Sequence, residues 1–258
     1  MDRGDCCSLA DARCPGVIVI MAPNDSLVTD NTRVLEARNV FYDFGETRAL
    51  RGASLVVRGG EIVAVMGPSG SGKSTLLHCL AGILLPQSGE VWFDQQRVDT
   101  LGDKDRSQLR RDVFGFVFQF GQLIPELTAE ENVALPLMLS GVRRSQALAR
   151  AGEWFDRLGL EGLQRRRSGE LSGGQAQRVA LARGFVARPK VLFTDEPTGS
   201  LDSLTGELVM EFMVAAARQD GTTVVLVTHD ARVAAYADRE VVVRDGVVGP
   251  LGGEPVVL

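Results

Sequence analysis

The chain has 258 residues, of which 45% are hydrophobic and 24% are charged, and its formal net charge at pH 7 is −5. This composition is ordinary for a globular protein of one large or two small domains. The net charge and the lack of a long basic stripe argue against nucleic acid as a partner, since the densest cationic cluster is Arg165–Arg167. Four cysteines and two histidines, without paired ligand spacing, leave no zinc site to assemble and favour a reducing, cytoplasmic setting.

The first 32 residues are predicted to form a poorly ordered extension. Their apolar run at 17–22 is too short to span a bilayer. Acidic residues precede this run where a signal peptide carries positive charge. Met21 is an alternative start of the protein. The folded part is expected to cover residues 33–249, with 250–258 as a short tail.

The N-terminal half of the folded part alternates between extended and helical patterns. Residues 33–40, 53–57 and 61–66 are predicted strands, with a turn at Arg58–Gly60, and together they predict an antiparallel start. Beyond them the pattern predicts a helix, a strand, a helix and a strand over residues 73–81, 89–94, 105–111 and 112–119.

The C-terminal half begins with helices and ends with strands. Amphipathic spacing predicts helices over 129–138, 145–158 and 174–187. The near-continuous apolar runs 191–194 and 223–227 are typical of strands buried on both faces of a parallel sheet, with a helix over 208–218 between them. The last predicted feature is a hairpin over 240–248, which turns at Asp245-Gly246.

A glycine-rich loop lies between the predicted strand 61–66 and the predicted helix 73–81, the context that a phosphate-binding loop requires. Its glycines let successive N–H groups point inward at a polyphosphate, and the helix dipole adds to the attraction. Lys73 is expected to reach the β- and γ-phosphates, and the Ser74 hydroxyl to ligate Mg²⁺. The residues predicted to bind a nucleoside triphosphate here are Gly67, Ser69, Gly70, Ser71, Gly72, Lys73, Ser74 and Thr75.

Two carboxylates follow the predicted strand 191–194. Asp195 ends this strand at the carboxyl edge, where α/β sheets place ligands, and is expected to hold the Mg²⁺ shell through water. Glu196 is placed to polarise the water that attacks the γ-phosphate. Taken alone, the two residues fit a solvated acidic pair equally well.

A second anion site is predicted where Ser172 precedes two glycines and Gln175 at a helix start, although a purely structural helix cap would have the same residues. The stretch Leu171–Arg183 resembles the signature motif of ATP-binding cassette proteins. The match continues through Asp195–Asp202, and the resemblance covers about residues 33–249.

The resemblance implies an α/β fold, the P-loop NTPase fold of ATP-binding cassette ATPases. This fold has a RecA-like core with a mixed sheet, an antiparallel β subdomain and an inserted α-helical subdomain. By the resemblance, the catalytic core takes about residues 33–119 and 188–249, and the helical subdomain takes about 120–187.

The resemblance also implies roles for single residues. Gln119 is similar to the glutamine that touches Mg²⁺ and the attacking water and senses the membrane partner. Asp202 is similar to the residue that crosses the dimer interface, and His229 to the switch histidine that contacts the γ-phosphate. Phe44 takes the place of the aromatic residue that stacks on adenine, with Tyr42 as the alternative.

The implied activity is ATP hydrolysis with Mg²⁺ by a homodimer. Each ATP would lie between the Lys73 loop of one chain and Ser172, Gly173, Gly174 and Gln175 of the other. The stretch 121–137 is most similar to cassettes that serve macrolide-exporter, lipoprotein-release and FtsX-like permeases, although Ser168 and Gly184 depart from that group.

The implied partner is a separately encoded FtsX-like permease that docks near residues 119–136, because the sequence contains no membrane-spanning segment. The protein would then lie on the cytoplasmic side of the plasma membrane, attached through the permease, and power export, lipoprotein or amphiphile extraction, or mechanical work. The alternatives are the ATPase subunit of a small-molecule importer and a cassette protein that acts on ribosomes or DNA.

Overall fold

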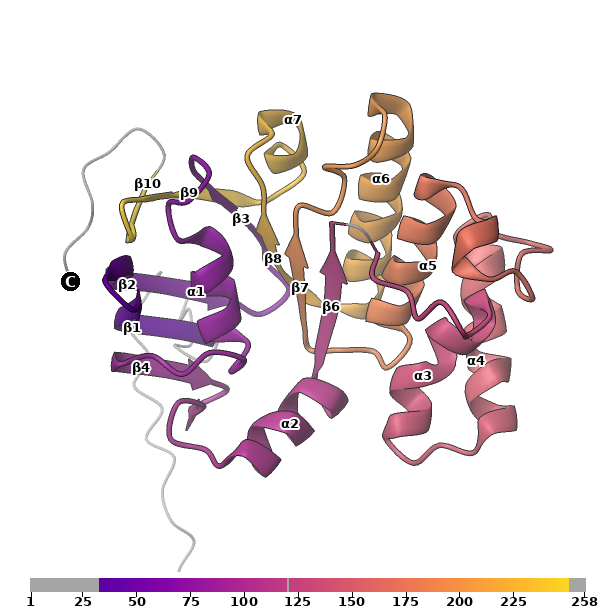
Figure 1. The fold of residues 1–258 in the computed structure, drawn as a ribbon, viewed down its shortest axis with the longest axis horizontal. Coiled ribbons are helices and arrows are strands. Elements are labelled where there is room, and N and C mark those ends of the chain that lie inside the picture. The colour runs from indigo at the N-terminus through magenta and orange to yellow at the C-terminus, as the bar shows by residue number, and fades with distance from the viewer. Residues whose placement is uncertain (1–32, 120, 251–258) are drawn as a thin grey trace, which may run out of the picture. The chain divides into compact units, whose positions relative to one another are not determined.

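The computed structural model describes residues 33–119 and 121–250. The predicted extension at 1–32 and the tail beyond residue 250 lie outside the described residues. Figure 1 shows the described part as two sheets with helices around them. None of its described helices combines the length and the hydropathy that a membrane span needs.

Strands and helices follow each other along the chain much as the sequence predicts. The strands are β1 (Arg33–Phe44), β2 (Thr47–Arg58), β3 (Ile62–Met66), β4 (Ser88–Phe93), β5 (Gln96–Arg97), β6 (Phe114–Phe118), β7 (Val191–Asp195), β8 (Thr223–Val227), β9 (Arg239–Arg244) and β10 (Val247–Pro250). The helices are α1 (Lys73–Leu80), α2 (Asp103–Asp112), α3 (Ala129–Leu139), α4 (Arg144–Arg157), α5 (Gly173–Phe185), α6 (Ser203–Asp220) and α7 (Ala231–Ala234).

The larger sheet has the strand order β10-β9-β3-β8-β7-β6. Its neighbouring strands pair in parallel from β9 to β6, and only β10 is antiparallel, so the sheet is mixed. Because parallel strands all end at one edge, the loops after β3, β6, β7 and β8 meet there. These are the loops that carry the predicted site residues.

The predicted antiparallel start is wrong for its third strand. β1 and β2 do pair in antiparallel fashion, within a separate sheet of order β2-β1-β4-β5. β3 instead joins the larger sheet, between β8 and β9 and parallel to both. The physical reason is burial: β1 and β2 bury alternate residues, whereas Ile62–Val65 are all buried, which suits a strand covered on both faces.

Two cores lie on the two faces of the larger sheet. Val225 and Phe193 belong to the core shared with α1 and the antiparallel sheet. Val224 and Leu192, their neighbours along the same strands, belong to the core shared with α3, α4, α5 and α6. Figure 1 shows these two layers on opposite sides of β7 and β8. The sheet edge is therefore held from both faces, which gives the site a rigid base.

Several boundaries differ from the predicted ones. The helix predicted over 208–218 begins earlier, at Ser203, because the Asp202 side chain caps it by accepting the Thr205 N–H. β5, α7 and a 3₁₀ turn at Ser168–Glu170 were not predicted. The hairpin around Asp245-Gly246 is confirmed, since both residues adopt positive φ, as that turn requires.

Candidate functional site

The phosphate loop follows β3 and ends at Gly72, which precedes the first residue of α1. Gly67 has φ 144° and Gly72 has φ 104°, values that L side chains rarely adopt. A Cβ on Gly67 would lie 2.2 Å from the Val243 carbonyl oxygen, and one on Gly72 would lie 2.4 Å from that of Ala49. The loop therefore needs glycine at both positions, for backbone conformation and for close packing.

Lys73 lies over the loop that precedes it. Lys73 is only 8% exposed, and its Nζ donates hydrogen bonds to the carbonyl oxygens of Gly67 (2.9 Å) and Pro68 (2.8 Å). The Ser71 hydroxyl is buried and has no hydrogen-bond partner among the described residues. A buried cation and an unsatisfied hydroxyl at a helix start are both suited to a polyphosphate. The donor set thus fits the predicted ligand.

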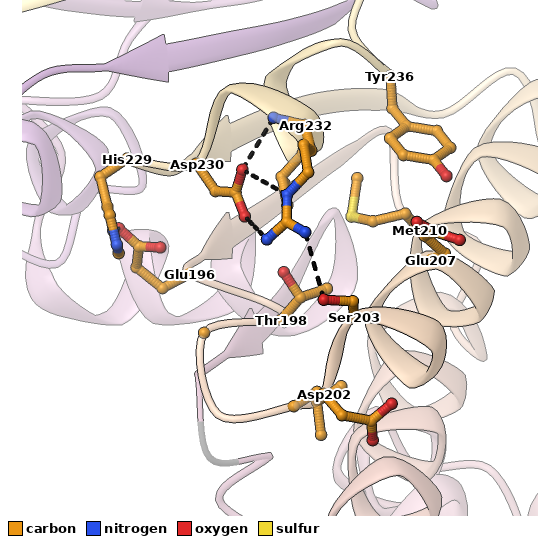
Figure 2. Close-up of a pocket in the computed structure, with 14 residues that line it drawn as sticks. Glu196, Thr198, Asp202, Ser203, Glu207, Met210, His229, Asp230, Arg232 and Tyr236 are labelled. Atoms are coloured by element: carbon orange, nitrogen blue, oxygen red, sulfur yellow. Dashed lines mark hydrogen bonds and ion pairs between the residues drawn. The ribbon is translucent and has the colours of Figure 1, made fainter.

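Glu196 and His229, which follow β7 and β8, meet at the sheet edge. Glu196 Oε1 lies 2.6 Å from His229 Nδ1, and the Thr228 hydroxyl donates to Glu196 Oε2 at 3.4 Å. The Glu196 side chain is 18% exposed and that of His229 is 63% exposed. Because a carboxylate only accepts hydrogen bonds, Nδ1 is the protonated nitrogen in this contact. Figure 2 shows the two side chains against each other.

Gln119 follows β6 and Asp195 ends the neighbouring strand β7, since Phe118 pairs with Asp195 in the β6–β7 register. The Gln119 backbone carbonyl accepts a hydrogen bond from the Ser200 hydroxyl at 3.0 Å. A Cβ on Gly199 would lie 2.8 Å from the Gln119 side-chain nitrogen, so the amide packs against this glycine. The fold brings Gln119, Asp195, Glu196 and His229 together.

Ser172–Gln175 form a capping box at the start of α5. The Ser172 hydroxyl accepts the Gln175 N–H at 3.3 Å, and Gln175 Oε1 accepts the Ser172 N–H at 2.9 Å. Gly173 and Gly174 pack against the start of α6, whereas the phosphate loop precedes α1 on the opposite side of β7 and β8 (Figure 1). A single chain therefore does not bring these two predicted anion sites together.

Asp202 caps α6 through both carboxylate oxygens. Oδ1 accepts the Thr205 N–H at 3.0 Å and Oδ2 accepts the Thr205 hydroxyl at 2.7 Å. The side-chain hydrogen bond from Thr205, followed by the backbone one, lowers the pKa of Asp202. Asp202 is exposed, so it presents a fixed, ionised carboxylate at the molecular surface.

The two candidate adenine-stacking rings lie at the end of β1. Phe44 is 53% exposed, whereas Tyr42 is partly buried and packs against the core. Their ring centroids are 4.9 Å apart with an interplanar angle of 65°. Of the two, Phe44 offers the more accessible ring face.

Two polar residues of α5 were missed by the sequence reasoning. Arg183 donates to the carbonyl oxygens of Gly121 (2.6 Å) and Gln122 (2.8 Å), and burial lowers the pKa of its guanidinium. Gln177 donates to the Phe118 carbonyl oxygen at 3.0 Å. Both residues thus anchor the chain around Gln119 to α5. Gln177 is buried on a helix face of otherwise apolar residues, but its acceptor is distant in sequence and only the fold supplies it.

A groove of about 560 Å³ lies beside this anchored segment. Its walls include Phe116 and Phe118 from β6, Leu135 and Leu139 from α3, and Arg110 from α2. Leu139 is 62% exposed, so the groove presents apolar surface to its surroundings. The groove is lined by residues near both ends of the predicted docking stretch at 119–136, including Gln122 and Ile124 near its start and Leu135 and Pro136 at its end.

Gly174→Ala should destabilise the protein by about 1–3 kcal/mol, the usual cost of overpacking. The new Cβ would lie 2.2 Å from Thr205 Cγ2, and α5 and α6 must separate to accommodate it. Thermal or urea unfolding measures the loss.

Thr205→Ser removes that methyl group and keeps the hydroxyl that bonds Asp202, so it should restore most of the stability of Gly174→Ala. Gly173→Ala is the matched control, because its nearest new contact is an ordinary 3.6 Å. Equal destabilisation by the two alanine variants would contradict the packing explanation.

A phosphate loop after the central parallel strand β3, with Asp195 and Glu196 at the end of β7 in the same sheet, defines a P-loop nucleotide-binding protein. A family model described as "ABC transporter" matches residues 50–199. The lipoprotein-releasing system ATP-binding protein LolD of Geobacter metallireducens is 47% identical over 207 residues, which are 80% of this chain and 92% of that protein. LolD of Paramagnetospirillum magneticum is 44% identical, over 87% of this chain and 98% of its own length.

Solved structures of other ATP-binding cassettes are also similar to this chain. The dimeric cassette MJ0796, in a post-hydrolysis state with ADP and Pi, is 40% identical with a TM-score of 0.77, and the match covers 85% of this chain and all of that one. CbiO1 of Clostridium perfringens is 32% identical with a TM-score of 0.76, covering 84% of this chain and 87% of its own. The chain belongs to the ABC transporter family, as one of its ATP-binding and ATP-hydrolysing subunits. The fold expected from the motifs is confirmed.

Proposed function

We propose that the chain is the ATPase of a lipoprotein-releasing type of complex, in which a homodimer drives a separately encoded FtsX-like permease. The observation that carries this proposal is the 47% identity to a LolD protein over 92% of that protein's length. Other LolD proteins are 42–45% identical over most of this chain. CbiO1, described as part of the ABC transporter complex CbiONQ, is less similar, at 32% identity.

In this proposal ATP is held by the phosphate loop of one chain. The loop N–H groups of Ser69–Gly72 bind phosphate oxygens, and Lys73 exchanges its two loop carbonyls for the β- and γ-phosphates. Thr75 adds a hydroxyl at the start of α1. Phe44 stacks on adenine, and Tyr42 is the alternative. The buried Ser71 hydroxyl gains the partner that it lacks among the described residues.

Glu196 is the proposed base for the attacking water. The hydrogen bonds from His229 Nδ1 and Thr228 fix its carboxylate, so no reorganisation is needed when the water is deprotonated. With Nδ1 engaged by Glu196, Nε2 of His229 remains for the γ-phosphate, to which it donates when it also carries a proton. This division of the two ring nitrogens accounts for both expected roles of the site.

Ser74, Gln119 and Asp195 are the proposed Mg²⁺ residues. They supply hydroxyl, amide and carboxylate oxygens, the donor types that Mg²⁺ accepts, directly or through water. A bound Mg²⁺ held by these residues would neutralise negative charge that develops on the phosphates during hydrolysis. Gln119 is held near Ser200 and Gly199, which keeps its amide at this edge of the sheet.

The second half of each site comes from the partner chain in this proposal. Ser172, Gly173, Gly174 and Gln175 would face the γ-phosphate held by the other chain, and Asp202 would cross the interface. The capping box supports this, because it pre-forms a helix start whose first residues, Ser172 and Gly173, are exposed. Nucleotide then favours the closed dimer through contacts that the open state lacks, and hydrolysis removes them.

The groove beside Gln119 is the proposed docking site for a permease helix. Its walls combine apolar side chains with arginines, which suits an amphipathic helix, and Arg183 and Gln177 link the adjacent segment to α5. Docking there would place the protein on the cytoplasmic face of the membrane that holds the permease. Helix movement could then reach Gln119 through this anchored segment.

The experiment is affinity purification of tagged Glu196→Gln from detergent-solubilised membranes with ATP and Mg²⁺, followed by mass spectrometry. We expect a permease with four spans and a large extracytoplasmic domain. A variant that also carries Leu139→Glu, in the exposed part of the groove, should form the nucleotide-bound dimer but lose the permease.

A many-span permease with a solute-binding protein would instead support the importer, and ribosomal proteins would overturn the transport assignment. Recovery of the same permease by both variants would contradict docking in this groove.

A further inference from the structure

A pocket of about 200 Å³ separates two loops that carry proposed site residues. One loop carries Asp202 and leads into Ser203, the first residue of α6; the other joins β8 to α7 and carries His229 and Asp230. Both loops and the start of each helix line the pocket. Figure 2 shows one side chain reaching from the α7 side to the α6 side, that of Arg232.

Arg232 binds both loops at once. Nη2 donates to Asp230 Oδ2 at 2.8 Å and Nε donates to Asp230 Oδ1 at 3.3 Å, while Nη1 donates to the Ser203 hydroxyl at 3.2 Å. The hydrogen bond from Arg232 is also the largest cause of the lowered pKa of Asp230, so that carboxylate stays ionised. The guanidinium fork is suited to such bridging because its donors point in fixed, divergent directions.

The bridge extends a hydrogen-bonded path that begins at the proposed base. The Thr228 hydroxyl donates to Glu196 at 3.4 Å and accepts the Asp230 N–H at 3.1 Å. Asp230 accepts from Arg232, and Arg232 donates to Ser203, the residue after Asp202. If the Glu196–His229 pair moves, this continuous chain of hydrogen bonds can therefore transmit the movement to the loop that carries Asp202.

We propose that Arg232 is a positioning residue that couples the hydrolytic site of one chain to its own Asp202 loop, and so to the ATP site of the partner. This inference rests on the proposed homodimer, in which Asp202 crosses the interface. Arg232 touches neither nucleotide nor reacting atoms in this scheme. Its side chain is 72% exposed, so its ion pair contributes little to folding stability, and its loss should alter communication more than stability.

The test compares Arg232→Ala, Ser203→Ala and the double variant by steady-state ATPase assay over a range of ATP concentrations. Each single variant should lower turnover about threefold to tenfold, the range for losing one hydrogen bond. We expect the Hill coefficient for ATP to exceed 1 in the parent and to fall to about 1 in these variants, in which the two sites no longer communicate. The double variant should be no worse than the worse single, since both remove the same link.

Two controls separate positioning from structure. Ser203→Thr keeps the hydroxyl and should retain the parent Hill coefficient. Arg218→Ala removes an exposed ion pair with Asp238 at the far end of α6 and should leave turnover unchanged.

Three results would overturn the inference and leave the proposed function intact: a parent with a Hill coefficient of 1, an Arg232→Ala variant as cooperative as its parent, or additive losses in the double variant. Failure of the proposed function is visible separately, as undiminished phosphate release by Glu196→Gln or as a parent that stays monomeric with ATP; either result would overturn both.

Discussion

Glu196→Gln is expected to bind ATP normally, to form a stable dimer and to release phosphate at least about a hundredfold more slowly than the parent, the lower range for loss of a general base. The amide retains the shape of the carboxylate and can still accept from His229 Nδ1, so the loop should keep its conformation. What is lost is the negative charge that polarises water. Phosphate release and size-exclusion chromatography with ATP and Mg²⁺ measure the two effects.

The matched control for this variant is Glu211→Gln, an exposed carboxylate further along α6. It removes the same charge without touching the site, and its turnover should equal that of the parent. Undiminished phosphate release by Glu196→Gln would refute the assignment of Glu196. Loss of ATP binding would point instead to a role in holding nucleotide.

Ser172→Arg is expected to abolish hydrolysis while leaving ATP binding to the monomer intact. The arginine would occupy the space before the exposed start of α5, where the partner's γ-phosphate is proposed to lie. Loss of the cap itself costs only about 1 kcal/mol, so the chain should stay folded. Nucleotide binding should survive because Lys73 and the loop before it lie at the start of α1, on the other side of the sheet. Ser145→Arg, exposed on α4, is the matched control for adding an arginine.

Mixing variants tests whether the site is shared between chains. Lys73→Ala and Ser172→Arg should each be inactive alone. In a mixed dimer, one site combines both changes and the other contains neither, so mixing should recover up to about a quarter of the parent activity if the two sites are equivalent. No recovery, or full activity of Ser172→Arg alone, would argue against the composite site.

The motifs that could be predicted from the sequence are those formed by residues close together along the chain. The phosphate loop needs only a strand, a run of glycines and a helix start in succession, and residues 61–81 encode all three by apolar runs and glycine spacing. The caps of α5 and α6 are local for the same reason, because Ser172 and Asp202 each bond the backbone three residues ahead. The unbroken apolar runs of β7 and β8 likewise predicted that both faces of these strands are buried.

The tertiary structure decided every pairing between distant segments. The apolar run of β3 is compatible with either sheet. Its place in the larger sheet is decided by parallel pairing with β8 on one side and β9 on the other. The contact between Glu196 and His229 depends on the adjacency of β7 and β8, since the two residues are 33 positions apart. The bridge from Arg232 to Ser203 depends on α7, a single turn too short to carry a periodic signal. Periodicity thus determined which residues form elements and local loops, whereas packing between elements decided which of their side chains act on one another.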